Sequence, residues 1–179
     1  GGSLTALLSD ATLAHLEWSR GREHDAIARL TGTSAPDPTR NRLAAGVTFT
    51  TAGKLSLTAE YEYNGFALSR SKATDLSTAS PALFGAYVLD ALRRQDLASR
   101  EAFLVYATQK GVFVRSVDVT ALMRVNADDH SRLGWLEIRN HWARLDVAVR
   151  LQQQGGRAAS EYGLLPDRRS VQVVGSYYF

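Results

Sequence analysis

Acidic, imidazole and hydroxyl side chains adjoin at one place in the sequence, Asp128-Asp129-His130-Ser131. Side chains of these types could bind a divalent cation or form a hydrolytic site. The spacing does not match the calcium-loop pattern, and hydrolysis needs a nucleophile, a base and an orienting acid brought together in space. Asp, His and Ser are also common turn residues. We therefore interpret the segment as a loop between strands and expect no catalytic residue, with a hydrolase kept as an alternative.

A second set of titratable side chains lies on the polar side of alternating segments. It comprises His15, Glu17, Glu137 and His141. A His–Glu pair can bind a ligand, but more often it belongs to an internal hydrogen-bond network. Glycine-rich phosphate loops, zinc patterns and nucleotide fingerprints are absent, and the chain has no cysteine. We expect no metal and no other cofactor.

Composition places the 179 residues in one domain, with 45% hydrophobic residues and a formal net charge of +3. No run of eighteen apolar residues occurs, which excludes a transmembrane helix but not a membrane strand, where every second residue is free to be polar. The arginines are scattered and form no stripe, so nucleic-acid binding is not expected.

Alternation of period two is the main structural signal. In the segment 55–64, Leu55, Leu57, Ala59, Tyr61 and Tyr63 share one face and polar residues share the other. Similar patterns predict about eight strands, near residues 11–22, 43–50, 55–64, 101–108, 116–126, 132–142, 144–153 and 170–179. Most have about ten residues, the length of a membrane strand, whereas ordinary strands average about five or six.

The predicted connections alternate in length. Short turns at 51–54, 109–111 and 143–144 separate the longer connections 21–41, 68–99, 126–131 and 155–169. Outer-membrane barrels show this alternation, and an even strand number would bring both chain ends to the short-turn side. Within 68–99, the stretch 82–96 has helical composition. It is expected to pack on neighbouring loops, and folding into the lumen is the alternative.

Charges of both signs lie in the middle of the polar faces. A soluble β-sandwich or lipocalin-like barrel also alternates, but mid-strand charges and aromatic residues near strand ends favour a membrane barrel. The residues expected to line its lumen are Glu60, Glu62, Asp118, Arg124, Glu137, Arg139 and Arg150. In a barrel of eight strands they would fill the interior as ion pairs, and in a larger one they would line a pore.

The last residues, Val171-Gln172-Val173-Val174-Gly175-Ser176-Tyr177-Tyr178-Phe179, alternate up to a terminal aromatic. This segment resembles the C-terminal signature of Gram-negative outer-membrane β-barrel proteins. The resemblance implies that Val171, Val173, Tyr177 and Phe179 act as an assembly signal read by the barrel-assembly machinery. It also implies a location in the bacterial outer membrane, contact with its lipid and lipopolysaccharide, and periplasmic chain ends.

The chain is thus expected to be all-β, an antiparallel up-and-down transmembrane barrel over residues 11–179. Residues 1–10 are interpreted as a linker-like or processed N-terminus. The barrel is either a small complete one or the C-terminal half of a larger one. The expected function is a porin-like channel that passes or exports solutes through a charged lumen. A closed structural barrel that presents its loops, and a lipid hydrolase at the membrane rim, are the alternatives. The sequence leaves the solute and the oligomeric state open.

Overall fold

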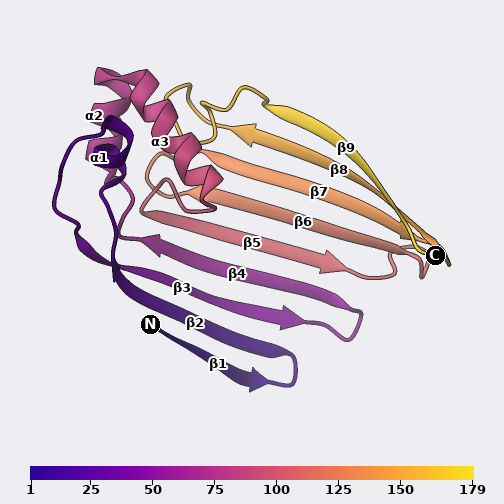
Figure 1. Ribbon diagram of the computed structural model, residues 1–179. Coiled ribbons are helices and arrows are strands. Elements are labelled where there is room, and N and C mark those ends of the chain that lie inside the picture. Colours follow the sequence, from indigo (N-terminus) through magenta and orange to yellow (C-terminus); the bar gives the residue numbers. More distant parts are fainter.

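The computed structural model describes residues 1–179 as a nine-stranded antiparallel sheet in which every strand pairs with its neighbours in sequence (Figure 1). Its strands are β1 (Gly2–Ser9), β2 (Thr12–Arg22), β3 (Thr39–Thr50), β4 (Leu55–Asn64), β5 (Glu101–Gln109), β6 (Val117–Asn126), β7 (Arg132–His141), β8 (Leu145–Gly155) and β9 (Arg169–Tyr177). Its helices are α1 (Ala26–Thr31), α2 (Arg70–Ala79) and α3 (Pro81–Arg93). The predicted all-β, up-and-down architecture is confirmed. None of the helices is long and apolar enough to cross a membrane.

The strand number corrects the sequence interpretation. Residues 2–9, set aside as linker-like, form β1, which pairs with β2 from Gly2 opposite Trp18 to Ser9 opposite Thr12. An even strand number with both chain ends on the short-turn side is therefore wrong. Gly1 lies at the end of the sheet with the long connections, and Phe179 lies at the other end (Figure 1). The sheet is not closed, since β1 pairs only with β2 and β9 only with β8.

The predicted alternation of connection lengths is found for most of the sheet, but the connection 127–131 is shorter than the turn 110–116. The long connections 23–38, 65–100 and 156–168 and the shorter 127–131 lie at one end, and the turns 10–11, 51–54, 110–116 and 142–144 lie at the other. The turn after β5 is longer than expected, and within it the Val112 amide donates to the carbonyl of Val117, the first residue of β6, at 2.7 Å. Phe113 lies in this turn with φ +63° and a fully exposed ring.

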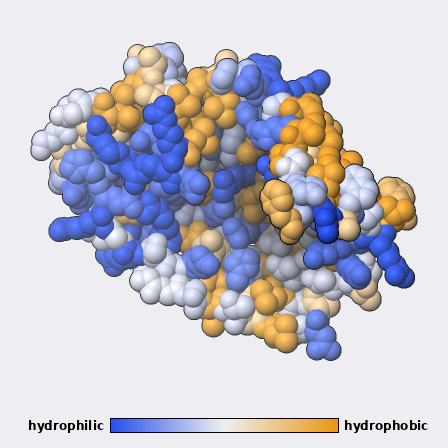
Figure 2. Space-filling model, turned by 45° about the vertical axis from the view of Figure 1, so that its right-hand side comes forward, coloured by the Kyte–Doolittle hydropathy of each residue, from blue (hydrophilic) through white to orange (hydrophobic).

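The strand registers separate two faces across all nine strands. Leu16, Ala45, Tyr61 and Phe103 follow one another on the apolar face, and His15, Gly46, Glu60 and Leu104 follow one another on the polar face. Most large apolar-face side chains are 37–71% exposed. In contrast, carboxylates of the polar face are mostly covered, with Glu62 16% and Glu137 10% exposed. In Figure 2, hydrophilic residues surround a hollow, and hydrophobic residues gather along the right-hand and lower margins.

The three helices and the connections 23–38 and 65–100 form a cap at the long-connection end of the sheet (Figure 1). Its small core comprises Phe84, Tyr87, Val88, Ala91 and Ala98, with Leu68, Leu76 and Leu164 packed against it. The Tyr87 hydroxyl donates to the Ala98 carbonyl at 2.6 Å and accepts from the Leu68 amide at 3.0 Å. The predicted helix 82–96 thus exists as α3, and it packs on neighbouring loops as expected. The helix α2 was not predicted.

Candidate functional site

The seven residues expected to line a lumen all lie on the polar face. Glu62 of β4 and Arg124 of β6 meet across β5, where the guanidinium donates from Nη2 to Oε1 at 2.6 Å and from Nε to Oε2 at 3.0 Å. The residues of β5 that lie between them in register are Ala102 and Leu104. A two-point Arg–carboxylate pair fixes both geometry and charge, so these strands share one ion pair.

A second ion-pair cluster lies on β7 and β8. Glu137 accepts from Arg139 at 2.9 Å and from Arg150 at 2.7 Å, and Arg150 lies 4.9 Å from the centre of the Trp135 ring. His141 approaches Asp146 at 3.0 Å and Asp118 at 3.4 Å. Most of these charges on the polar face are therefore paired with a neighbouring charge of opposite sign.

The third contact pairs His15 of β2 with Glu60 of β4, at 2.7 Å between Nε2 and Oε2. Gly46 of β3 lies between them in register, and a Cβ there would meet His15 Cε1 at 2.6 Å and the Ala59 carbonyl oxygen at 2.9 Å. Glycine is therefore required for the two side chains to join above β3. The histidines and glutamates grouped in the sequence analysis do not pair with one another: His15 binds Glu60, His141 contacts two aspartates, and Glu137 binds arginines.

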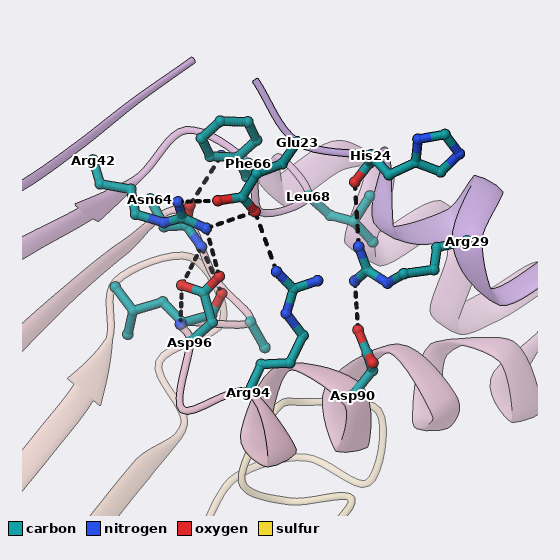
Figure 3. A network of polar contacts seen from close by, with 12 residues as sticks. Glu23, His24, Arg29, Arg42, Asn64, Phe66, Leu68, Asp90, Arg94 and Asp96 are labelled. Carbon is teal, nitrogen blue, oxygen red and sulfur yellow. Dashed lines mark hydrogen bonds and ion pairs between the residues drawn. The ribbon is translucent and has the colours of Figure 1, made fainter. Parts of the chain in front are cut away.

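A polar network that no local sequence pattern indicates ties the cap to the polar face of the sheet, which we call the wall (Figure 3). Arg42 of β3 binds both Glu23 and Asp96, with Nη2 at 2.9 Å from Glu23 Oε2 and 2.8 Å from Asp96 Oδ2. Its guanidinium also lies 4.6 Å from the centre of the Phe66 ring. We call Arg42, Glu23 and Asp96 the Arg42 clamp. The hydrogen bonds that Glu23 accepts from Arg42 lower the pKa of Glu23.

Further contacts extend the clamp in both directions. Asn64 at the end of β4 donates its amide to Asp96 Oδ1 at 2.9 Å and to the Leu97 carbonyl at 3.0 Å. Arg94 reaches Glu23 at 3.3 Å. Separately, Arg29 of α1 binds Asp90 of α3 at 2.6 Å. Two connections far apart in sequence are thus fastened to each other and to the wall (Figure 3).

A hollow of about 500 Å³ separates the segment 95–97 from the polar face. Its wall side includes Glu17, Arg42, Ala44, Glu62 and Arg124, and its cap side includes Gln95, Asp96 and Leu97. The cap therefore overhangs the polar face near the long-connection end.

The segment 128–131 serves as a turn in the structure. Asp129 accepts from the Ser131 amide at 2.8 Å and from the Glu161 amide at 2.7 Å. Ser131 is fully buried, and its hydroxyl accepts from the Tyr162 amide at 3.3 Å. Asp129 and Ser131 are thus both bonded to the connection 156–168. This geometry gives no support to a hydrolytic pairing of His130 with Ser131.

Glu161 is a buried carboxyl that sequence reasoning missed. It is 4% exposed and accepts from the Asn126 amide at 2.8 Å. Burial, and to a smaller extent the charge of Asp129, raises the pKa of Glu161 to about 7. A cavity of about 270 Å³ next to it is shared by α2, α3 and the connection 156–168. Burial also raises the pKa of Tyr162.

The terminal residues Val171, Val173 and Tyr177 lie on the apolar face of β9, at the free edge of the sheet, and are 57–71% exposed. The strand ends at Tyr177, and the rings of Tyr177 and Phe179 meet edge to face at 5.3 Å. The candidate site thus consists of the paired charges of the polar face and the cap above them. A scan against protein-family models and searches of curated proteins and of solved structures find no match to this chain.

Proposed function

We propose that this chain forms the wall of an outer-membrane β-barrel whose polar face lines a lumen for small hydrophilic solutes. One observation carries the proposal: most large apolar side chains of one face are exposed, while most charged side chains of the other are partly covered and paired. A protein in water places its faces the other way round, because contiguous exposed apolar surface is unfavourable there. Lipid reverses this preference.

Aromatic residues support the same orientation. Trp18 and Tyr63 lie on the apolar face near the long-connection end, and Phe49 and Tyr177 lie on it near the short-turn end. Amphipathic rings favour the headgroup level, so two aromatic rows separated by aliphatic residues match the two interfaces of a bilayer. Such an arrangement has no evident use on a soluble sheet.

The polar face predicts the charge preference of the lumen. We count charges on the polar face between the row of paired residues that contains Glu17 and the row that contains Asp146. This region carries six carboxylates, on Glu17, Glu60, Glu62, Asp118, Glu137 and Asp146. The only arginines at these levels are Arg124, Arg139 and Arg150. Because fixed charges on a pore wall bias ion passage, the lumen is expected to prefer cations.

Planar-bilayer recording of the refolded chain tests the proposal. We expect stable current steps that scale with salt and a reversal potential in a salt gradient that indicates cation preference. Glu17 is exposed and forms no ion pair, so Glu17→Gln should weaken this preference without loss of folding. Asp10→Asn, in the exposed turn between β1 and β2, is the matched control. A refolded chain that closes into a barrel yet passes no current would contradict the channel.

A closed barrel that presents its loops is the second candidate. The mutual pairing of Glu137, Arg139 and Arg150 and the packed cap favour it, because both would suit an interior that no solute crosses. Insertion into lipid vesicles without conductance is its signature. An electrophoretic mobility that is the same before and after boiling would contradict both candidates.

A further inference from the structure

The hollow beneath the segment 95–97 is bounded by the wall on one side and by the cap on the other. Glu17, Ala44 and Glu62 are neighbours in register on β2, β3 and β4, and they form its wall side with Arg124. Gln95, Asp96 and Leu97 face them. A solute that moves along the polar face beneath the cap at this level would enter this space.

Backbone hydrogen bonds tie the segment 95–97 to the end of α3, from the Gln95 amide to the Leu92 carbonyl at 3.1 Å and from the Asp96 amide to the Ala91 carbonyl at 2.9 Å, and side chains tie it to the sheet. Asp96 is bound by Arg42, and its other carboxylate oxygen and the Leu97 carbonyl accept from Asn64. Arg42 also binds Glu23, which precedes α1, so one guanidinium joins two separate connections to β3. A planar guanidinium suits such simultaneous recognition, because its donors are fixed in direction.

We infer that the Arg42 clamp holds residues 95–97 as a constriction at the long-connection end of the polar face, and that Arg42 sets the largest solute admitted there. The inference rests on the proposed lumen. Arg42 acts as a positioning residue: it places the segment that narrows the passage. Loss of its side chain leaves Asn64 as the remaining link from the wall to Asp96 and Leu97.

The test measures access to the hollow without any need for current. The chain has no cysteine, so Ala44→Cys provides a single thiol in the hollow. Its reaction rate is measured in detergent with a small methanethiosulfonate reagent and with a bulky polyethylene-glycol maleimide. Arg42→Gln and Asp96→Asn are each combined with Ala44→Cys. Arg93→Gln, which removes an exposed charge from the same cap outside the clamp, is the control.

We expect Arg42→Gln to accelerate the bulky reagent about tenfold while the rate of the small reagent changes less than about twofold, since only the width of the passage has changed. Asp96→Asn should act in the same direction, and Arg93→Gln should change neither rate. Equal acceleration of both reagents, or an effect of Arg93→Gln as large as that of Arg42→Gln, would overturn the inference.

Each variant is first checked for the mobility shift between boiled and unboiled samples. If both clamp variants lost it, the clamp would be a requirement for folding and the inference would be wrong. Recording in bilayers separates the two proposals. A conducting parent whose single-channel step is unchanged by Arg42→Gln refutes the constriction alone. A parent that closes into a barrel, passes no current and shows the expected reagent rates refutes the channel alone.

Discussion

Replacement of Glu161 by glutamine tests how the connection 156–168 is held. Glu161 is almost completely buried, its carboxylate accepts from Asn126, and Asp129 lies close by. Burial, followed by the charge of Asp129, raises the pKa of Glu161 from 4.5 to about 7, and the hydrogen bond from Asn126 opposes this rise. Each tenfold change in acidity corresponds to about 1.4 kcal/mol, so ionisation costs the closed connection about 3 kcal/mol relative to an open, hydrated one.

The raised pKa of Glu161 determines how the stability of the closed connection changes with pH. Because the pKa of the closed form is the higher one, the closed form binds the proton more tightly. Its stability is fully present below the ordinary carboxyl range near pH 4.5 and is lost as the pH rises through about 7. Across this window, the opening equilibrium of residues 157–164 should increase about a hundredfold.

Hydrogen exchange measured by mass spectrometry reports this equilibrium, after correction for the pH dependence of chemical exchange. Glu161→Gln keeps an acceptor for Asn126 but has no charge to bury, so its opening equilibrium should stay constant with pH. Asp167→Asn, exposed in the same connection, should retain the behaviour of the parent. A parent whose protection does not fall between pH 4 and about 8, or a glutamine variant that falls equally, would refute the buried-carboxyl explanation.

Three further predictions concern the sheet and use folding equilibria in lipid or detergent. Ile138→Arg, on the exposed apolar face, should destabilise the inserted sheet by about 2–4 kcal/mol, whereas Gln152→Arg on the polar face should cost much less; equal costs would contradict a lipid-facing surface. Gly46→Ala should cost about 1–3 kcal/mol, because its Cβ would meet His15 and the Ala59 carbonyl, and Gly175→Ala, with open space around it, should be nearly neutral. Glu62→Gln should cost about 1–2 kcal/mol by leaving Arg124 without its carboxylate, and Glu62→Gln combined with Arg124→Gln should recover part of the loss in a double-mutant cycle.

Local pattern predicted most of the sheet and little of the cap. The strand β4 and its faces were readable because side-chain direction alternates with every residue. By contrast, the chain begins with Gly-Gly-Ser, which is typical of a linker, and the strand β1 from Gly2 is recognisable only by its pairing with β2. The helix α2 is polar and has no apolar stripe, so its packing against α3 leaves no periodic signal.

In the candidate site too, local pattern predicted the faces of the strands but not the contacts between distant residues. Alternation was enough to place Glu62 and Arg124 on one face, but their pairing across β5 depends on the register of three strands. The Arg42 clamp joins residues whose positions in the sequence are 19 and 54 apart, and no local pattern links them. Glu161 was missed because its burial comes entirely from tertiary contacts with Asn126 and the neighbouring turn.

The odd number of strands has a geometric consequence for the two free edges of the sheet. Because successive strands reverse direction, β1 and β9 run the same way, from the long connections to the short turns. The two edges cannot pair with each other in antiparallel fashion. Any set of strands that closes this sheet with antiparallel bonds on both sides must itself be odd in number, since it has to begin and end with strands opposed to β1 and β9. The free edges therefore fix the parity and the direction of whatever completes the wall.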